Sequence, residues 1–181
     1  HEGYIGAVLL PALRARGHAV FGLDTGYFIG CDFTSPRPSP PSQQIDVRDL
    51  EAIQLDGIDA VIHLAALSND SLGEIDPALT HEINHLAAVA LAEKAKRAGV
   101  RRFLFSSSCS IYGASDDILS ETSPLNPLTA YARSKVQTEA ALDHIADGGF
   151  SPVFLRNATA YGVSPRLRID IVLNNLVGWA C

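Results

Sequence analysis

Apolar residues along this chain follow two spacings that alternate from the amino end to the carboxyl end. In residues 5–13 and 77–98 they recur at helical intervals, and a glycine follows each run. Residues 59–65 and 101–107 are instead short apolar runs, which are typical of buried strands. Helices of crossover length between such strands predict a parallel sheet covered on both faces. The expected fold class is α/β, doubly wound and Rossmann-like.

The same reasoning predicts further elements and gives one helix an inward face. They are strands at 18–24, 45–47 and 151–157, a helical turn at 49–54, a helix at 127–146 and a proline-rich surface loop at 34–44. In the helix 77–98, the residues expected to face inward are Leu79, Ile83, Leu86, Val89, Ala90 and Leu91. The chain starts within a glycine-rich turn that should follow a strand, and it contains no methionine. We therefore expect an internal piece of a longer protein, lacking the first strand of its sheet.

Composition excludes several classes of function. A net charge of −6 argues against a nucleic-acid surface, which would need a basic stripe. No apolar run reaches the roughly 18 residues of a membrane span, so we expect no membrane segment. The three cysteines, Cys31, Cys109 and Cys181, have no metal-ligand spacing and no even number for pairing, which favours a cytoplasmic location.

Glycines at the start of the chain indicate a dinucleotide-binding turn. Gly3 would let the backbone approach a phosphate, and Gly6 would let the following helix pack against its strand. Asp24 ends the next predicted strand about 20 residues later, where a carboxylate can accept from ribose hydroxyls. Because that carboxylate would repel a 2′-phosphate, the pattern favours NAD over NADP. The alternative is that Gly3 and Gly6 are ordinary turn glycines and Asp24 is a loop acid. That alternative does not explain why glycines, helix, strand and acid follow one another in this order.

Tyr131 and Lys135 stand four residues apart in a predicted helix, and Ser108 closes a triple serine at the end of a predicted strand. A phenol titrates at about pH 10, so tyrosine is a poor base at neutral pH unless a cation lowers its pKa. Lys135 shares a helix face with Tyr131 and can supply that cation. Ser108 can donate to the substrate oxygen whose proton Tyr131 removes. These three residues are the candidate catalytic set.

These motifs resemble those of the extended short-chain dehydrogenases/reductases, in the NAD-dependent nucleotide-sugar epimerase/dehydratase group, and are closest in pattern to sugar 4-epimerases. The resemblance covers nearly the whole chain and rests on residues 3–6, 24, 46–47, 61–66, 84, 106–113, 131–135 and 174–176. It implies NAD as cofactor, a nucleotide-sugar as substrate and a homodimer of the full-length protein. It also implies an incomplete NAD-binding domain over 1–162 and the beginning of a substrate-binding region over 163–181.

The resemblance also assigns roles residue by residue. The cofactor-binding residues that it implies are Gly3, Tyr4, Ile5, Gly6, Asp24, Asp46, Val47, Leu64, Ala65, Ala66, Asn84, Ser106, Tyr131 and Lys135. The substrate-binding residues that it implies are Ser108, Thr159, Asn174 and Asn175. It implies that Asn84 braces the loop after the strand 59–65, and it implies no metal site.

The residues after Ser108 indicate which of the reactions of this group the chain can catalyse. Dehydratases of the family carry Asp-Glu there, whereas this chain has Cys109 and Ser110, which disfavours a dehydratase. Some epimerases of the group use a cysteine two residues before the motif tyrosine, which here is the place of Ser110. Cys109 lies one residue earlier, and a shift of one residue on a strand turns the side chain to the opposite face, so we expect Cys109 to be small and buried rather than an acid. Ser, Tyr and Lys alone suit a hydride shuttle, so we expect NAD-dependent epimerisation through a keto intermediate. The alternatives are a keto-sugar reductase, a non-catalytic dinucleotide sensor of the same fold, and an inactive piece of an active enzyme.

Other polar residues have simpler interpretations. His63 lies in an apolar strand and is expected to be a core histidine with satisfied hydrogen bonds. His81 and His85 are four apart on a helix but lack a third ligand, so they are interpreted as exposed or partly packed imidazoles. Arg166 and Arg168 are expected either to meet substrate phosphates or to be solvated.

Overall fold

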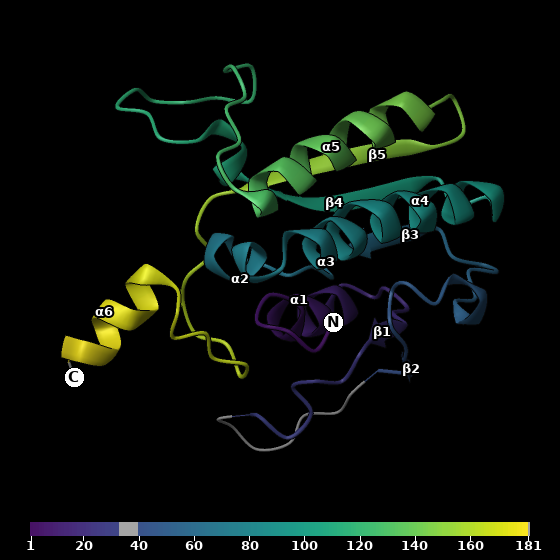
Figure 1. The fold of residues 1–181 in the computed structure, drawn as a ribbon. Coiled ribbons are helices and arrows are strands. Elements are labelled where there is room, and N and C mark those ends of the chain that lie inside the picture. Colours follow the sequence, from purple (N-terminus) through teal and green to yellow (C-terminus); the bar gives the residue numbers. More distant parts are fainter. Residues whose placement is uncertain (33–39, 181) are drawn as a thin grey trace. The chain divides into compact units, whose positions relative to one another are not determined.

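The computed structural model describes residues 1–32 and 40–180 of the chain, and Figure 1 shows its elements. The chain divides into two compact units, each described by itself. The first unit consists of His1–Asp46 and Thr159–Cys181, and the second of Val47–Ala158. Most of the loop expected at 34–44 lies outside the described residues.

Strands and helices alternate through the second unit, whereas in the first unit two short strands follow one helix. The elements of the first unit are α1 (Gly6–Ala15), β1 (Gly22–Asp24), β2 (Ser42–Gln44) and α6 (Val172–Ala180). Those of the second unit are the 3₁₀ turn η1 (Leu50–Ala52), β3 (Ala60–His63), α2 (Asp70–Ile75), α3 (Pro77–His81), the π-helical turn η2 (Glu82–Ala87), α4 (Ala88–Arg97), β4 (Arg102–Ser108), the 3₁₀ turn η3 (Cys109–Tyr112), α5 (Ala130–Ile145) and β5 (Ser151–Asn157).

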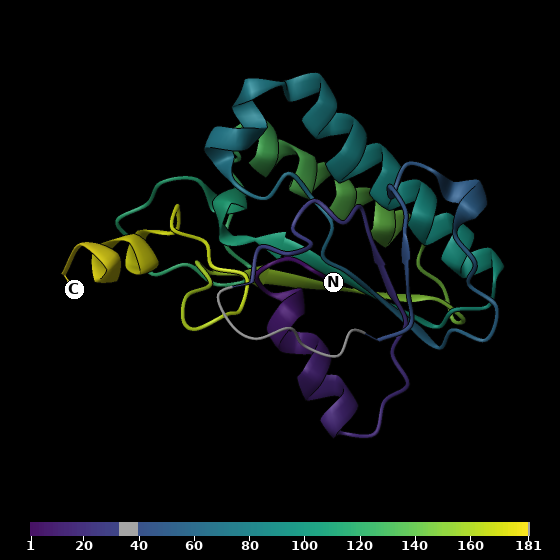
Figure 2. The same ribbon diagram turned by 90° about the horizontal axis from the view of Figure 1, so that it is seen from below.

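The strand pairs among the described residues are all parallel. β1 pairs with β2, and β4 lies between β3 and β5. Across the three-stranded sheet, Ala60 lies opposite Arg102, which lies opposite Ser151. Figure 1 and Figure 2 show the helices of the second unit gathered on one face of that sheet. The expected Rossmann-like α/β class is confirmed.

The strands of the first unit differ from the prediction in length and place. The strand expected over 18–24 starts only at Gly22, because its partner β2 offers three residues for pairing. The strand expected at 45–47 lies at Ser42–Gln44 instead. Ser-Gln-Gln is exposed at every position, so apolar periodicity does not reveal it. Backbone pairing with β1, rather than side-chain burial, determines where this strand lies.

The helix expected over 77–98 is continuous but changes its winding. α3 leads into the π-helical turn η2, and α4 completes the helix before Gly99 adopts a positive φ of 83°. A π turn inserts a residue and rotates the side chains that follow it. Leu86 is therefore 52% exposed, and its predicted inward position is wrong, whereas Asn84 is buried.

Side-chain caps set helix boundaries that periodicity misses. The helix expected from residue 127 starts at Ala130, because Thr129 caps its first turn by accepting from the Ala132 backbone at 3.1 Å. α2 is not predicted by periodicity, and its cap is Asn69, which accepts from the Leu72 backbone at 2.6 Å. Within the described ranges, no helix is both long enough and apolar enough to span a bilayer.

The core of the second unit lies between its sheet and its helices. Phe103 and Phe105 of β4, Leu142 of α5 and Phe150 are almost wholly buried. The rings of Phe103 and Phe150 are 6.2 Å apart between centres, a favourable aromatic distance. This packing holds α5 against β4, and so holds the residues that α5 carries.

Candidate functional site

β4 ends at Ser108, and the chain then enters the short turn η3. Ser108 is 9% exposed, and its Oγ accepts a hydrogen bond from the Ser110 backbone at 3.1 Å. A hydroxyl can accept and donate at the same time, so this contact leaves its proton for another acceptor. Ser108 can therefore donate to a ligand oxygen at the carboxyl end of the strand.

α5 carries Tyr131 and Lys135 one turn apart and packs against β4 and η3. Both side chains are buried, with 8% and 3% exposure. The Lys135 Nζ lies 5.5 Å from the centre of the Tyr131 ring, within the range of cation–π contacts. The ammonium group thus lies beside the phenol, as the four-residue spacing predicts.

Lys135 is held by the strand against which α5 packs. Its Nζ donates to the Ser106 carbonyl oxygen at 2.8 Å and lies 4.7 Å from the centre of the Phe105 ring. Burial lowers the pKa of Lys135 to about 7, and the Glu139 carboxylate partly opposes that shift. With this pKa, Lys135 changes between its charged and neutral forms near neutral pH. Ser106, an expected cofactor residue, also accepts through its Oγ from Asn157 at 3.1 Å.

Asp70 of α2 joins the segments that carry the candidate catalytic residues. One of its oxygens accepts from the Ser110 hydroxyl at 3.1 Å, and the other accepts from the hydroxyl of Thr129, the cap of α5. Glu74, one turn further along α2, accepts from the backbone of the first turn of α5. Sequence reasoning missed this link, and the one local signal for it is Asn69, which starts a helix at Asp70.

The loop after β3 contains Leu64, Ala65 and Ala66, at the carboxyl end of the sheet. Asn84 braces this loop, because its Oδ1 accepts from the Leu67 backbone at 2.8 Å and its Nδ2 donates to the Leu67 oxygen at 3.1 Å. The expected brace is confirmed, and it accounts for the burial of this polar side chain within the π turn. Contact of these residues with a cofactor stays a prediction.

In the first unit, residues 3–6 form the turn that leads into α1. A Cβ on Gly6 would lie 2.4 Å from the His1 carbonyl oxygen, so only glycine fits there. A Cβ on Gly3 would meet no atom within 4 Å, so this side of the turn is open. Of the other two residues, Tyr4 is partly buried and Ile5 is 40% exposed.

Asp24 ends β1 with its carboxylate surrounded by donors. Oδ2 accepts from the Glu2 backbone at 2.9 Å, and Oδ1 accepts from the Gly26 backbone at 2.8 Å. Burial alone would raise the pKa of this carboxyl, but these contacts lower the pKa below its usual value. Asp24 therefore stays ionised. A carboxylate has about four acceptor sites, so capacity remains for a ribose hydroxyl.

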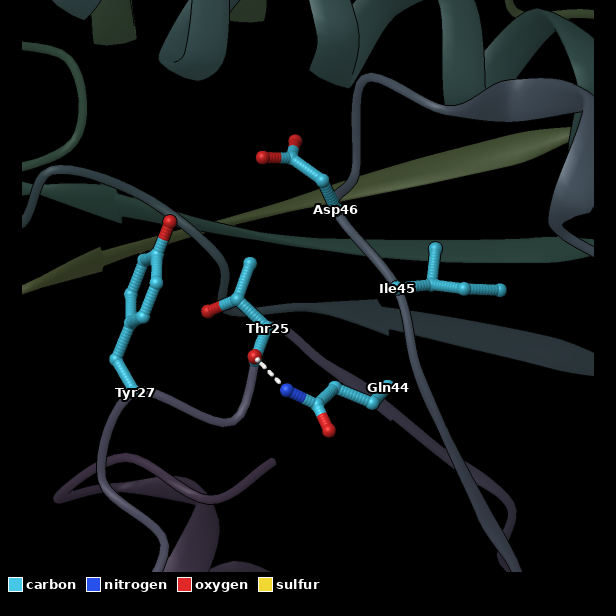
Figure 3. Close-up of a pocket in the computed structure, with 5 residues that line it drawn as sticks. All are labelled: Thr25, Tyr27, Gln44, Ile45 and Asp46. Atoms are coloured by element: carbon cyan, nitrogen blue, oxygen red, sulfur yellow. Dashed lines mark hydrogen bonds between the residues drawn. The ribbon is translucent and has the colours of Figure 1, made fainter.

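A small open pocket lies where β1 and β2 end. Its volume is about 330 Å³, and it is lined by Thr25, Tyr27, Gln44, Ile45 and Asp46. In Figure 3, the side chains of Tyr27, Thr25 and Asp46 face a common space, whereas Ile45 points away from it. Asp46 is the one residue among them to which the family resemblance assigned a role. Val47, the next expected cofactor residue, is partly buried in the second unit.

The expected substrate residues other than Ser108 belong to the first unit. Thr159 is exposed after the end of β5. Asn174 of α6 accepts from the Gly162 backbone at 3.2 Å and donates to the Tyr4 hydroxyl at 3.1 Å. Asn175 donates to a backbone oxygen six residues earlier, at 3.1 Å. Both asparagines thus stabilise the first unit, and their contact with a substrate stays a prediction.

Two expectations for polar residues are wrong, and one of the two alternatives for Arg166 is excluded. Cys109 is exposed, because β4 ends one residue earlier and strand alternation does not continue into η3. His63 is buried, but in the described part of the chain its Nε2 has no hydrogen-bond partner. Arg166 is not solvated, since it is 6% exposed and pairs with Glu2 at 2.9 Å and Asp32 at 3.5 Å.

His81 and His85 lie close together, with ring centres 4.9 Å apart. His85 is partly buried and shares a hydrogen bond of 3.2 Å with Thr138. Burial and the neighbouring His81 lower the pKa of His85. Among residues 1–32 and 40–180, no three His, Cys, Asp or Glu side chains are grouped so as to hold a metal ion.

Comparison of the sequence with known proteins identifies the family to which the chain is similar. A family model described as the NAD dependent epimerase/dehydratase family matches residues 1–177. The chain is 33% identical over 156 residues to a UDP-glucose 4-epimerase of Mycolicibacterium smegmatis. That alignment covers 78% of this chain and 48% of the relative.

Comparison of the fold with solved structures agrees. MoeE5 in complex with UDP-glucuronic acid and NAD is similar with a TM-score of 0.81 and 31% identity, over 97% of this chain and 57% of that one. TunA, an NAD-dependent NDP-hexosamine 5,6-dehydratase, has a TM-score of 0.84 and 27% identity over the same shares. The chain spans about half the length of the relatives that it matches.

Proposed function

This chain belongs to the NAD-dependent epimerase/dehydratase family, and we propose that the full-length protein epimerises a nucleotide-sugar through a transient keto intermediate. One observation carries the proposal. Lys135 is buried one turn from Tyr131 on α5, and α5 packs against the strand that ends at Ser108. An ammonium, a phenol and a hydroxyl in one unit are the groups that proton removal beside a hydride transfer needs.

Residues of each unit fit NAD, the cofactor of this family. In the first unit, the space at Gly3 is open to the approach of a phosphate, and the ionised Asp24 can accept from a ribose hydroxyl. In the second unit, residues 64–66 and Lys135 are further candidates for contact with the cofactor. When bound, NAD accepts a hydride from a sugar carbon and later returns it.

Tyr131 is the base in this proposal. Its phenol ionises more easily beside the Lys135 ammonium, which stabilises the phenolate. The phenolate takes the proton of a sugar hydroxyl, and the carbon that bears this hydroxyl becomes a ketone as its hydride leaves. Ser108 donates to the same oxygen and offsets the charge that develops on it. Return of the hydride to the opposite face and of the proton to the oxygen gives the epimer, with no net redox change.

The positions after Ser108 favour epimerisation over loss of water. Neither Cys109 nor Ser110 has a carboxylate that could remove water from a sugar. The carboxylate that meets Ser110 is that of Asp70, and both of its oxygens already accept hydrogen bonds within the second unit. The proposed reaction therefore uses no further acid at this place.

A panel of UDP-, GDP- and dTDP-sugars, incubated with the full-length protein, tests the proposal. We expect one sugar to interconvert with its 4-epimer without net consumption of NAD. The Tyr131→Phe variant should still bind that sugar nucleotide but turn it over about 10²–10⁴-fold more slowly, because it lacks the general base. Net oxidation or reduction of the sugar, or wild-type turnover by Tyr131→Phe, would contradict the proposal.

The same proposal extends to the setting of the full-length protein. We propose a cytoplasmic homodimer with a nucleotide-sugar as its small-molecule partner, and a substrate-binding region that begins at 163–181. The family resemblance supports the dimer, and the unpaired cysteines Cys31 and Cys109 support a reducing compartment. Light scattering of the full-length protein tests the homodimer. The mass of a single subunit would contradict it.

A further inference from the structure

Glu139 lies one turn beyond Lys135 on α5, and both side chains are buried. Their exposures are 5% and 3%. Residues four apart share a helix face, so the Glu139 carboxylate stands on the side of α5 that carries Tyr131 and Lys135. A carboxylate near a buried ammonium favours the charged form of the lysine.

Arg156 of β5 holds this carboxylate in place. Its Nε donates to both Glu139 oxygens at 3.1 Å, and its Nη2 donates to Oε2 at 2.7 Å. Its Nη1 donates to the Tyr112 hydroxyl at 2.9 Å and to the Glu121 backbone oxygen at 2.7 Å. A guanidinium held from two sides keeps its orientation, and its bidentate contact fixes the position of the Glu139 carboxylate.

We propose that Glu139, oriented by Arg156, is a positioning residue that keeps Lys135 cationic and so sets the pH range in which Tyr131 acts as a base. Glu139 acts through Lys135 and does not itself meet the substrate. The inference rests on the proposed function, because it gives the charge of Lys135 a role in that reaction.

The groups nearest to Lys135 leave Glu139 as the one that raises its pKa. From β4, the Ser106 carbonyl and the Phe105 ring meet Nζ, and neither of them titrates. From β3, His63 is neutral at physiological pH, since burial and the charge of Lys135 lower its pKa to about 3. Burial pushes the pKa of Lys135 down, and Glu139 acts in the opposite direction.

Other charged groups packed on α5 are engaged elsewhere. His85 of η2 meets Thr138 at 3.2 Å. Lys96 of α4 donates to the Ile145 backbone oxygen at 2.7 Å, near the far end of α5. Asp70 and Glu74 of α2 accept from the start of α5. The contacts of Lys96, Asp70 and Glu74 lie at the two ends of α5, and the contact of His85 is with the Thr138 hydroxyl, so the pair of Glu139 and Arg156 is the control point.

NMR of the full-length protein, with isotope-labelled lysine and a pH titration, reads the pKa of Lys135 directly. Lys135→Arg identifies the signal by removing it. We expect Glu139→Gln to lower the pKa of Lys135 by about one unit, which is a tenfold loss in the ratio of charged to neutral form. Glu139→Asp keeps the charge and should restore most of the wild-type pKa.

The matched control is Asp147→Asn, which removes a carboxylate that pairs with Lys96 at 2.6 Å and should leave the pKa of Lys135 unchanged. A loosened fold gives the opposite sign from the expected one. If water reaches Lys135, its pKa rises toward about 10.4, the value of an exposed lysine. An unchanged or raised pKa of Lys135 in Glu139→Gln overturns the proposal.

The pH profile of turnover separates this inference from the proposed function. In Glu139→Gln, the alkaline limb of kcat should move to lower pH by the same amount as the pKa of Lys135. A limb that stays in place while the pKa falls overturns the role of Lys135 in the proposed function, but not the control of Lys135 by Glu139.

Discussion

In the second unit, Phe103, Phe105 and Phe150 are almost wholly buried, and the first two lie against the ring of His63. In the first unit, Ala7 and Pro40 are the buried apolar side chains among the described residues, and Phe28 and Tyr27 are more than half exposed. Burial of an aromatic side chain stabilises a fold by about 2–3 kcal/mol, so the second unit has the larger apolar contribution to its own stability.

The first unit relies instead on polar contacts between segments far apart in sequence. Arg166 pairs with Glu2 and Asp32, and Asn174 donates to the Tyr4 hydroxyl. Catalysis needs side chains held within fractions of an ångström, whereas a loop that grips a cofactor can gain order from the ligand. The proposed chemistry therefore lies on the unit with the packed core.

The largest expected effect is a loss of stability when the same substitution, Phe to Ala, is made in the second unit rather than in the first. Phe103→Ala should lower the free energy of unfolding by about 3–5 kcal/mol, because it leaves a cavity under the sheet of the second unit. Phe28→Ala, in an exposed loop of the first unit, should change it by less than about 0.5 kcal/mol. Urea unfolding of the two full-length variants measures both values.

Equal losses in Phe103→Ala and Phe28→Ala would contradict the comparison. That result would mean that the loop around Phe28 is packed in the full-length protein as tightly as the core strand. A loss confined to Phe103→Ala would show that apolar burial stabilises the second unit and not the loop around Phe28.

A smaller effect is expected from His63, which is buried against two of these rings. Burial, and next the charge of Lys135, lower the pKa of His63 from 6.5 to about 3. Between those values the unfolded chain takes up a proton that the folded chain does not, so stability is complete above pH 6.5 and falls as the pH drops toward 3. At pH 4.5 this amounts to about 2–3 kcal/mol.

The His63→Leu variant isolates this contribution, because leucine does not titrate. Urea unfolding at pH 7 and pH 4.5 should show a fall in stability for wild type that exceeds the fall for the variant by that amount. Identical falls in the two proteins would show that His63 is accessible to protons in the folded state, and that the core of the second unit is looser than its burial indicates.

The elements that the sequence predicts well are those marked by apolar runs. β4 and β5 lie within a residue of their expected bounds, because apolar runs mark both. β2 was displaced in the prediction because its polar residues form a strand only through backbone pairing with β1. The π turn at η2 has no sequence pattern of its own, and it moved Leu86 out of the face on which periodicity had placed it.

The candidate site likewise has features that the sequence predicts and contacts that it does not. The approach of Lys135 to Tyr131 follows from helix geometry, and the place of Ser108 follows from the end of a strand. The partners of these residues do not follow, since Asp70 meets Ser110 across 40 positions and Glu139 meets Arg156 across 17. Such contacts depend on how helices and strands pack, and one sequence alone carries no spacing that reveals them.

The smallest expected effect concerns Asp70, which joins η3 to the start of α5. Asp70→Ala removes its hydrogen bonds to Ser110 and Thr129, so Ser108 and Tyr131 lose a common anchor. We expect kcat to fall about tenfold, equivalent to about 1.4 kcal/mol, with little change in KM, because positioning matters most in the transition state. Steady-state kinetics of the full-length variant measures this.

Asp76→Ala is the matched control, because Asp76 is also an aspartate of the second unit that accepts a hydrogen bond at a helix start. It caps α3 by accepting from the Leu79 backbone at 2.9 Å and has no bond to η3 or α5. Both variants should lose about 1 kcal/mol of stability, since each removes a hydrogen-bonding carboxylate. Only Asp70→Ala should lose turnover as well. An equal fall in kcat for the two variants would mean that general loosening of the second unit, rather than the link through Asp70, limits the reaction.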